Sequence, residues 1–366
     1  MTTFTESSDE LLDSDGLPGG EEPGSGESPS LRPRALIVTI YGLYAREYDG
    51  WLSVAALIRL MATLGVDEPA VRSSISRLKR RGLLDPHRPA GAAGYALSAS
   101  GRRMLAEGDR RLFGRASPSG PAAPAAGEPV AGESAARERA TGGQPAGGWV
   151  LAVFSVPEAE RKQRHALRSR LSWLGFGTVS AGVWIAPGHL AAETREVLAA
   201  DGLAGYVALF QAGYLAFGDI ASQVGRWWDL DRLQHMYQDF CRTFAPWLSV
   251  WDNGEATSGS LAGEPLAMRD TASEPAATGP PAGEPPAMAA AAGDPTGDAA
   301  AFAAYVRVLT DWRRLPFLDP GLPADLLPVP WQGRVAAELF AALAARLAPA
   351  AERYVRAVVA GEPVVR

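Results

Sequence analysis

Apolar residues at regular spacing divide the chain into three blocks that can fold, at residues 31–115, 148–250 and 300–360. The stretches around these blocks are rich in Gly, Pro, Ala, Glu and Ser and lack helical or strand periodicity. Segments of this composition bury too little apolar surface to fold. We therefore expect a disordered acidic tail at 1–30, a disordered linker at 116–147 and a disordered insertion at 254–297.

The first block shows three short helices in its apolar pattern. After Pro33, apolar residues recur at helical spacing as far as Tyr44. Ser53 can cap a second helix that ends at Gly65, and Asp67 can cap a third helix that ends at Gly82. A short helix, a tight turn and a further helix form the helix-turn-helix arrangement.

The third helix has a thin apolar stripe, and its remaining faces are polar and basic. Its candidate DNA contacts are Arg72, Ser73, Ser74, Ser76, Arg77, Lys79 and Arg80. Short apolar runs on either side of a Pro/Gly-rich loop then predict a hairpin, or wing, with His87 and Arg88 near its tip, and Ser98 can cap a fourth helix. Because the major groove admits one helix, this order predicts a winged helix-turn-helix over 31–115 that binds double-stranded operator DNA. The alternative is that the basic helix is only a solvated face.

The middle block, 148–225, reads as strand, helix, two strands, helix and strand. This βαββαβ order is typical of a ferredoxin-like sheet. The outer face of its first helix is basic, and the candidate effector contacts there are Arg161, Lys162, Arg164 and Arg168. Two interpretations stay open for this face: it keeps the protein in solution, or it binds the phosphates of an effector or of DNA.

The last block, 226–366, is predicted to be mainly helical, which makes the whole chain α+β. Its tryptophans are expected to pack in the core or between domains, with the lining of a ligand cavity as the alternative; they are Trp227, Trp228, Trp247, Trp312 and Trp331. Cys241 lies on a predicted helix and is expected to fill core space, because no histidine is paired with it in the sequence.

Charge is distributed unevenly along the chain. The net charge is −6, yet residues 31–115 carry fifteen Arg or Lys against seven Asp or Glu, a net charge of +8. Residues 1–30 carry eight acids and no Lys or Arg. A segment this basic favours a polyanionic partner.

Several functional classes are disfavoured by composition. The single cysteine allows no internal disulfide and indicates the cytoplasm, and the four scattered histidines give no metal-ligand spacing. Apolar runs are too short for a membrane span, and the acidic N-terminus is unlike a secretory signal. We expect no cofactor.

The middle block resembles the small CRISPR-associated ferredoxin-fold nuclease, in which the first strand ends in a metal-binding Asp. Here Ser155 and Val156 occupy that strand end and Pro157 follows. Without a carboxylate, Mg²⁺ cannot be held against a phosphate. We therefore expect a scaffold without enzyme activity; the alternative is a metal-dependent nuclease or toxin-like enzyme built on this block.

Six motifs in order resemble the PaaX family of phenylacetic-acid catabolon repressors. They are PRALIVTIYGLY, VRSSISRLKRRGLL, GYALSASGRRML, WVLAVFSVPEAERKQRHALRSRLSWLGFGTVSAGVWIAP, WWDLDRLQHMYQDFCRTF and RRLPFLDPGLPADLLPVPWQGRVAAELF. The resemblance implies a homodimeric winged-helix repressor of a phenylacetate-type catabolic operon, released from DNA by an aryl-CoA thioester such as phenylacetyl-CoA. It places Arg72, Ser76 and Arg77 on the DNA-reading helix.

Overall fold

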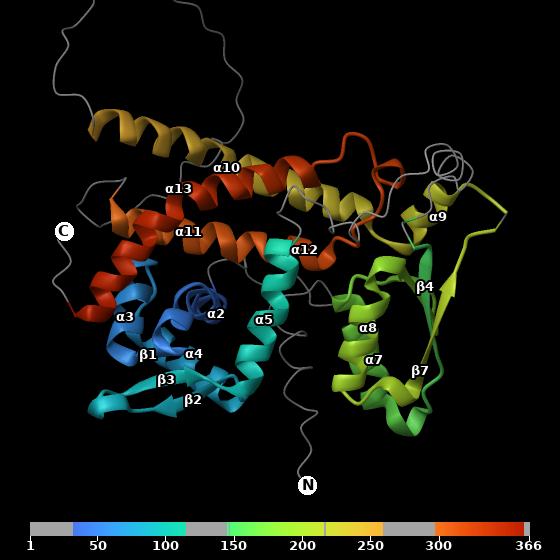
Figure 1. Cartoon of the computed structure of the whole chain (residues 1–366), viewed down its shortest axis with the longest axis horizontal. Coiled ribbons are helices and arrows are strands. Elements are labelled where there is room, and N and C mark those ends of the chain that lie inside the picture. Colours follow the sequence, from blue (N-terminus) through green and yellow to red (C-terminus); the bar gives the residue numbers. More distant parts are fainter. Residues whose placement is uncertain (1–31, 115–144, 146, 216, 259–296, 362–366) are drawn as a thin grey trace, which may run out of the picture.

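The computed structural model describes residues 32–114, 145, 147–215, 217–258 and 297–361. The predicted tail, almost all of the predicted linker and most of the predicted insertion lie outside these residues. Two lobes are visible in Figure 1: one joins the first and last blocks, and the other is the middle block. Within the described part, no helix is both long and apolar enough to cross a membrane.

Residues 32–114 form four helices and a small antiparallel sheet in the order β1-β3-β2. The predicted caps are confirmed: Ser53 Oγ accepts the Ala56 N–H at 3.0 Å, and Asp67 Oδ1 accepts the Ala70 N–H at 2.8 Å. The third strand, β1, was not predicted. The elements are α2 (Pro33–Tyr44), β1 (Trp51–Ser53), α3 (Val54–Thr63), α4 (Glu68–Arg80), β2 (Leu84–His87), β3 (Gly94–Leu97) and α5 (Ala99–Gly114).

The middle block has the predicted βαββαβ element order. Its four strands form one antiparallel sheet in the order β5-β6-β4-β7. Helices α7 and α8 cover one face, where Leu167 and Leu171 join Val150 and Phe154 of β4 in one core. The elements are β4 (Trp149–Phe154), α7 (Arg161–Trp173), β5 (Gly177–Ser180), β6 (Val183–Pro187), α8 (Ala191–Ala200) and β7 (Val207–Ala212).

The other face of this sheet is covered by α9 (Ile220–Trp227) and by residues from the last block. The Trp149 ring lies 5.7 Å from the Trp227 ring and 6.0 Å from the Trp228 ring. Leu322 and Leu326 complete this smaller core. The predicted boundary between residues 225 and 226 falls inside α9, so the middle unit extends to Trp228.

Four further helices make up the rest of the described chain. Helix α10 continues past Pro246 to Ser258, so its last residues overlap the insertion expected at 254–297. The last helix continues past Pro349 to Ala360. The elements are α10 (Leu230–Ser258), α11 (Asp298–Trp312), α12 (Leu315–Leu318) and α13 (Gly333–Ala360).

The first and last blocks share one hydrophobic core. The buried hydroxyls of Thr39 on α2 and Thr310 on α11 are 2.9 Å apart. The hydroxyls of Thr63 on α3 and Tyr354 on α13 are 2.6 Å apart. Arg59 Nη2 donates to the Val358 carbonyl at 2.5 Å. Polar contacts therefore fix the register of an extensive apolar interface.

The shared core predicts that damage to α13 destabilises the first block too. Val355 is 1% exposed within this core, whereas Val335 on the same helix is 43% exposed. Val355→Ala should lower the free energy of unfolding by about 2 kcal/mol, from lost burial and the cavity left behind. Urea unfolding should show the first and last blocks melting together.

Val335→Ala is the matched control, because it removes the same two methyl groups from an exposed position, and it should leave the unfolding midpoint nearly unchanged. Separate transitions for the first and last blocks in the Val355→Ala protein would contradict the shared core.

Candidate DNA-binding site

Helix α4 buries one face and exposes a basic one. Val71, Ile75 and Leu78 are buried in the shared core, as the apolar stripe predicts. The exposed residues of the helix are the candidate contacts Arg72, Ser73, Ser76, Arg77, Lys79 and Arg80. Six predicted contacts therefore lie on the solvent side of the helix.

Ser74 is a correction to the predicted set. Its exposed fraction is 8%, because it lies on the same side of α4 as the buried Val71, Ile75 and Leu78. A side chain in that position cannot reach a DNA groove without unfolding the helix. Ser74 was among the candidate DNA contacts predicted from the sequence, whereas the structure buries it with the three apolar residues of the helix.

Arg72 forms an exposed ion pair with a residue one turn earlier on α4. Its Nε donates to Glu68 Oε1 at 2.7 Å, one turn earlier, and both side chains are exposed. A surface ion pair of this kind contributes little to stability. Glu68 and Arg72 both lie in the N-terminal half of α4, the part of a recognition helix that contacts base edges.

The predicted wing is formed by β2 and β3, with His87 at the end of β2 opposite Gly94. His87 and Arg88 are both exposed. A Cβ atom at Gly94 would lie 2.5 Å from the Leu52 carbonyl oxygen, so only glycine fits there. Trp51 Nε1 donates to the His87 carbonyl at 3.2 Å, so the unpredicted strand β1 supports the end of β2 next to the wing loop. The signal in the sequence was the short apolar pair Trp51-Leu52 after Gly50.

The predicted effector contacts all lie on α7, and Arg164 and Arg168 contact other groups of the middle unit. Arg164 Nη2 lies 2.5 Å from Glu158 Oε2, and this pairing lowers the pKa of the Glu158 carboxyl. The Arg168 guanidinium lies over the Trp184 ring at 5.9 Å from its centre. Arg161 and Lys162 are exposed in the first turn.

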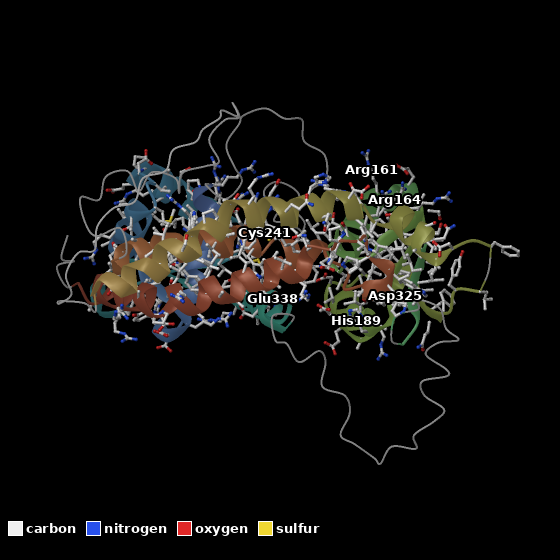
Figure 2. All side chains as sticks on the ribbon, turned by 90° about the horizontal axis from the view of Figure 1, so that it is seen from above. Arg161, Arg164, His189, Cys241, Asp325 and Glu338 are labelled. Carbon is white, nitrogen blue, oxygen red and sulfur yellow. The ribbon has the colours of Figure 1, made fainter. Side chains whose placement is uncertain are left out.

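The α7 cations and the tryptophans Trp227 and Trp228 lie on opposite faces of the middle sheet. Helix α7 covers one face of the sheet, and these two tryptophans pack against the other. In Figure 2, Arg161 and Arg164 lie together at one margin of the molecule, and His189 and Asp325 lie toward the opposite margin. The sequence pattern cannot reveal this separation, because it depends on which face of the sheet each helix covers.

The strand end where a nuclease would hold its metal carries no carboxylate. Ser155 follows β4 and is exposed. Within the described residues, no group of three or more His, Cys, Asp or Glu side chains is arranged to hold a metal ion. Cys241 is half-buried against the shared core, and burial raises the pKa of its thiol, which agrees with a packing role.

These features describe a protein that presents an exposed basic helix beside a β-hairpin. Comparison with known families then assigns the chain: it belongs to the PaaX family. Residues 32–101 match the model described as PaaX-like protein, 143–224 the PaaX protein central Cas2-like domain, and 285–357 the PaaX-like protein C-terminal domain.

One curated relative and one solved structure illustrate the similarity. The chain is 23% identical over 326 residues to the transcriptional repressor PaaX of Escherichia coli (strain K12), covering 88% of this chain and 82% of that protein. An uncharacterized protein of Mycobacterium tuberculosis is 20% identical, with 89% of this chain and 99% of that chain covered and a TM-score of 0.46.

The geometry of α4 predicts that Arg72 contributes to DNA affinity beyond its ion pair. Arg72→Ala should weaken binding to a specific DNA site by about 1 to 3 kcal/mol if Arg72 contacts a base, and should relax the base preference at one position. Competition gel shifts with single-base variants of the site measure both effects.

Arg334→Ala is the matched control, because Arg334 on α13 forms an equivalent exposed ion pair with Glu338, four residues away. Both substitutions remove one positive charge and one i,i+4 ion pair. Equal DNA affinities for the two variants would show that α4 does not read bases through Arg72.

Proposed function

We propose that this protein is a transcriptional repressor that binds operator DNA through a winged helix-turn-helix at residues 32–114. The proposal rests on the two faces of helix α4. Val71, Ile75 and Leu78 anchor the helix in the core, and three arginines and a lysine are exposed to solvent. Family membership supports it, since the curated relative is a transcriptional repressor. A protein with this role acts on the chromosome, so we place it in the cytoplasm.

The middle and last units need no catalytic activity for this role. The strand order β5-β6-β4-β7, with two helices on one face, supports a ferredoxin-like assignment for the middle unit. The nuclease or toxin-like alternative requires a carboxylate at the end of β4, where this chain has Ser155. We therefore propose a regulator and not an enzyme.

We propose that the repressor acts as a homodimer. One winged-helix unit buries about 600–1,000 Å² on DNA, which is little for high specificity, and two units on a two-fold axis double the contact. Two half-sites should be separated by one turn of DNA, roughly 34–36 Å, or a multiple of it.

Mapping the protein on its own genome, followed by gel shifts on the recovered sites, tests operator binding. We expect an inverted repeat and an affinity that falls linearly with salt on a double logarithmic plot, because Lys and Arg release counterions from the phosphates. Light scattering should report a dimer. Binding that is independent of salt, or a monomer both on and off DNA, would count against the proposal.

The proposed effector is an aryl-CoA thioester such as phenylacetyl-CoA, and the proposed target is a phenylacetate-type catabolic operon. An effector releases DNA only if it prefers the DNA-free conformation. A preference of about 5.5 kcal/mol shifts a population from 1:99 to 99:1. The exposed cations of α7, Arg161 and Lys162, are one candidate phosphate contact.

Titration of operator-bound protein with phenylacetyl-CoA, free CoA and free phenylacetate tests the effector proposal. Release by the thioester alone is expected, because only the thioester combines the phosphates with the aryl group. If no acyl-CoA alters either DNA affinity or thermal stability, the sensor role is refuted and DNA binding stands alone.

A further inference from the structure

The C-terminal half of α4 carries three cations that the described part of the chain does not neutralise. Arg77, Lys79 and Arg80 are all exposed. None of the three forms an ion pair with a described carboxylate, in contrast to Arg72, which pairs with Glu68. We call these three residues the α4 cations. Their charge is available to an anionic partner.

A strongly acidic stretch of the chain joins the same unit. Residues 1–30, which we call the acidic N-terminal stretch, carry eight acids and no Lys or Arg. The described structure begins at Arg32, one residue before α2, and α2 packs against α4. The negative charge is therefore attached to the helix against which α4 packs.

The acidic N-terminal stretch is long enough to reach α4. A folded unit of the size of 32–114 measures about 30 Å across. Each residue advances the chain by at most about 3.5 Å, so Glu22, ten residues before Arg32, can lie up to about 35 Å from it. Glu21 and the acids before it reach further still. Chain length therefore permits contact between these carboxylates and the exposed face of α4.

Attachment to the same chain favours this contact. A single pair of exposed charges contributes little free energy, because water screens it. Two groups joined through one chain, however, meet at an effective concentration of about millimolar, and several acids act on the same three cations. DNA phosphates that approach α4 would have to displace these carboxylates.

The basic face of α7 is a poorer partner for the acidic N-terminal stretch. Figure 1 shows α7 in the lobe formed by the middle block, whereas the stretch joins α2 in the other lobe. Two of the four α7 cations, Arg164 and Arg168, contact Glu158 and the Trp184 ring. Both position and existing contacts therefore favour α4.

We propose that the acidic N-terminal stretch binds the α4 cations of its own chain and competes with DNA for this helix. The stretch lowers DNA affinity, because part of the free energy of phosphate binding is spent on displacing its carboxylates. The competition with DNA rests on the proposed function, whereas the contact between the stretch and α4 does not.

Carbodiimide cross-linking, which joins a carboxylate to a nearby amine, tests the contact without DNA. The chain has two lysines, Lys79 among the α4 cations and Lys162 on α7. We expect mass spectrometry to find peptides from 1–30 joined to Lys79. This product should disappear at about 1 M salt, where the Debye length falls to about 3 Å. Products joined to Lys162 and not to Lys79 would overturn the proposal, as would a product that joins two chains.

Binding of a DNA duplex of arbitrary sequence measures the competition. One full-length variant replaces five acids of the acidic N-terminal stretch by amides, and the matched control replaces the five acids of 259–296, so both change the net charge equally. At about 50 mM salt the first variant should bind the duplex at least about threefold more tightly than the wild type, with an advantage that shrinks as salt screens the contact. The control should bind as the wild type does. The two variants are Asp13→Asn/Asp15→Asn/Glu21→Gln/Glu22→Gln/Glu27→Gln and Glu264→Gln/Asp270→Asn/Glu274→Gln/Glu284→Gln/Asp294→Asn.

The two measurements separate this inference from the proposed function. Equal gains in the two variants would reveal an effect of net charge alone and overturn the proposal, and a product at Lys79 without any gain in DNA affinity would overturn the competition. If the wild type binds the duplex and 1–30 gives no product at Lys79, the inference falls while DNA binding stands. If 1–30 is joined to Lys79 and no duplex is bound, the contact stands and the proposed function fails.

Discussion

The packing of α2 and α3 against α11 and α13 fixes the position of every candidate DNA contact. The Thr39–Thr310 and Thr63–Tyr354 hydroxyl pairs lie at this interface, and a one-turn slip of either helix would leave these groups without partners. Because α4 and the wing are built on α2 and α3, their orientation is set by the last block. The DNA-binding unit is therefore an integral part of a larger core.

This architecture restricts how a ligand signal can reach the DNA. A rigid interface transmits displacement, since close-packed cores shift between discrete arrangements and do not deform smoothly. Helix α12 and the segment before it are the part of the interface that touches α5, α7 and α10 together.

Much of the local structure was predictable because it depends on short-range chemistry. Ser53 and Asp67 cap helices through bonds to residues three positions on, and Val71, Ile75 and Leu78 define the buried stripe of α4 by spacing alone. What the pattern could not show depends on distant contacts. The three-residue strand β1 is stabilised by pairing with β3, whose paired residues lie 41 to 45 positions further along the chain, and the burial of Ser74 depends on how α4 packs. The site residues themselves stay predictions, apart from Ser74.

The two basic surfaces of the protein differ in a way that matches different partners. On α4 the charges are exposed and spread over several turns, which suits a long polyanion whose counterions are released along its length. On α7 two of the four candidate cations, Arg164 and Arg168, contact Glu158 and the Trp184 ring. Charge alone therefore does not distinguish the two surfaces, whereas the contacts that their cations make within the protein do.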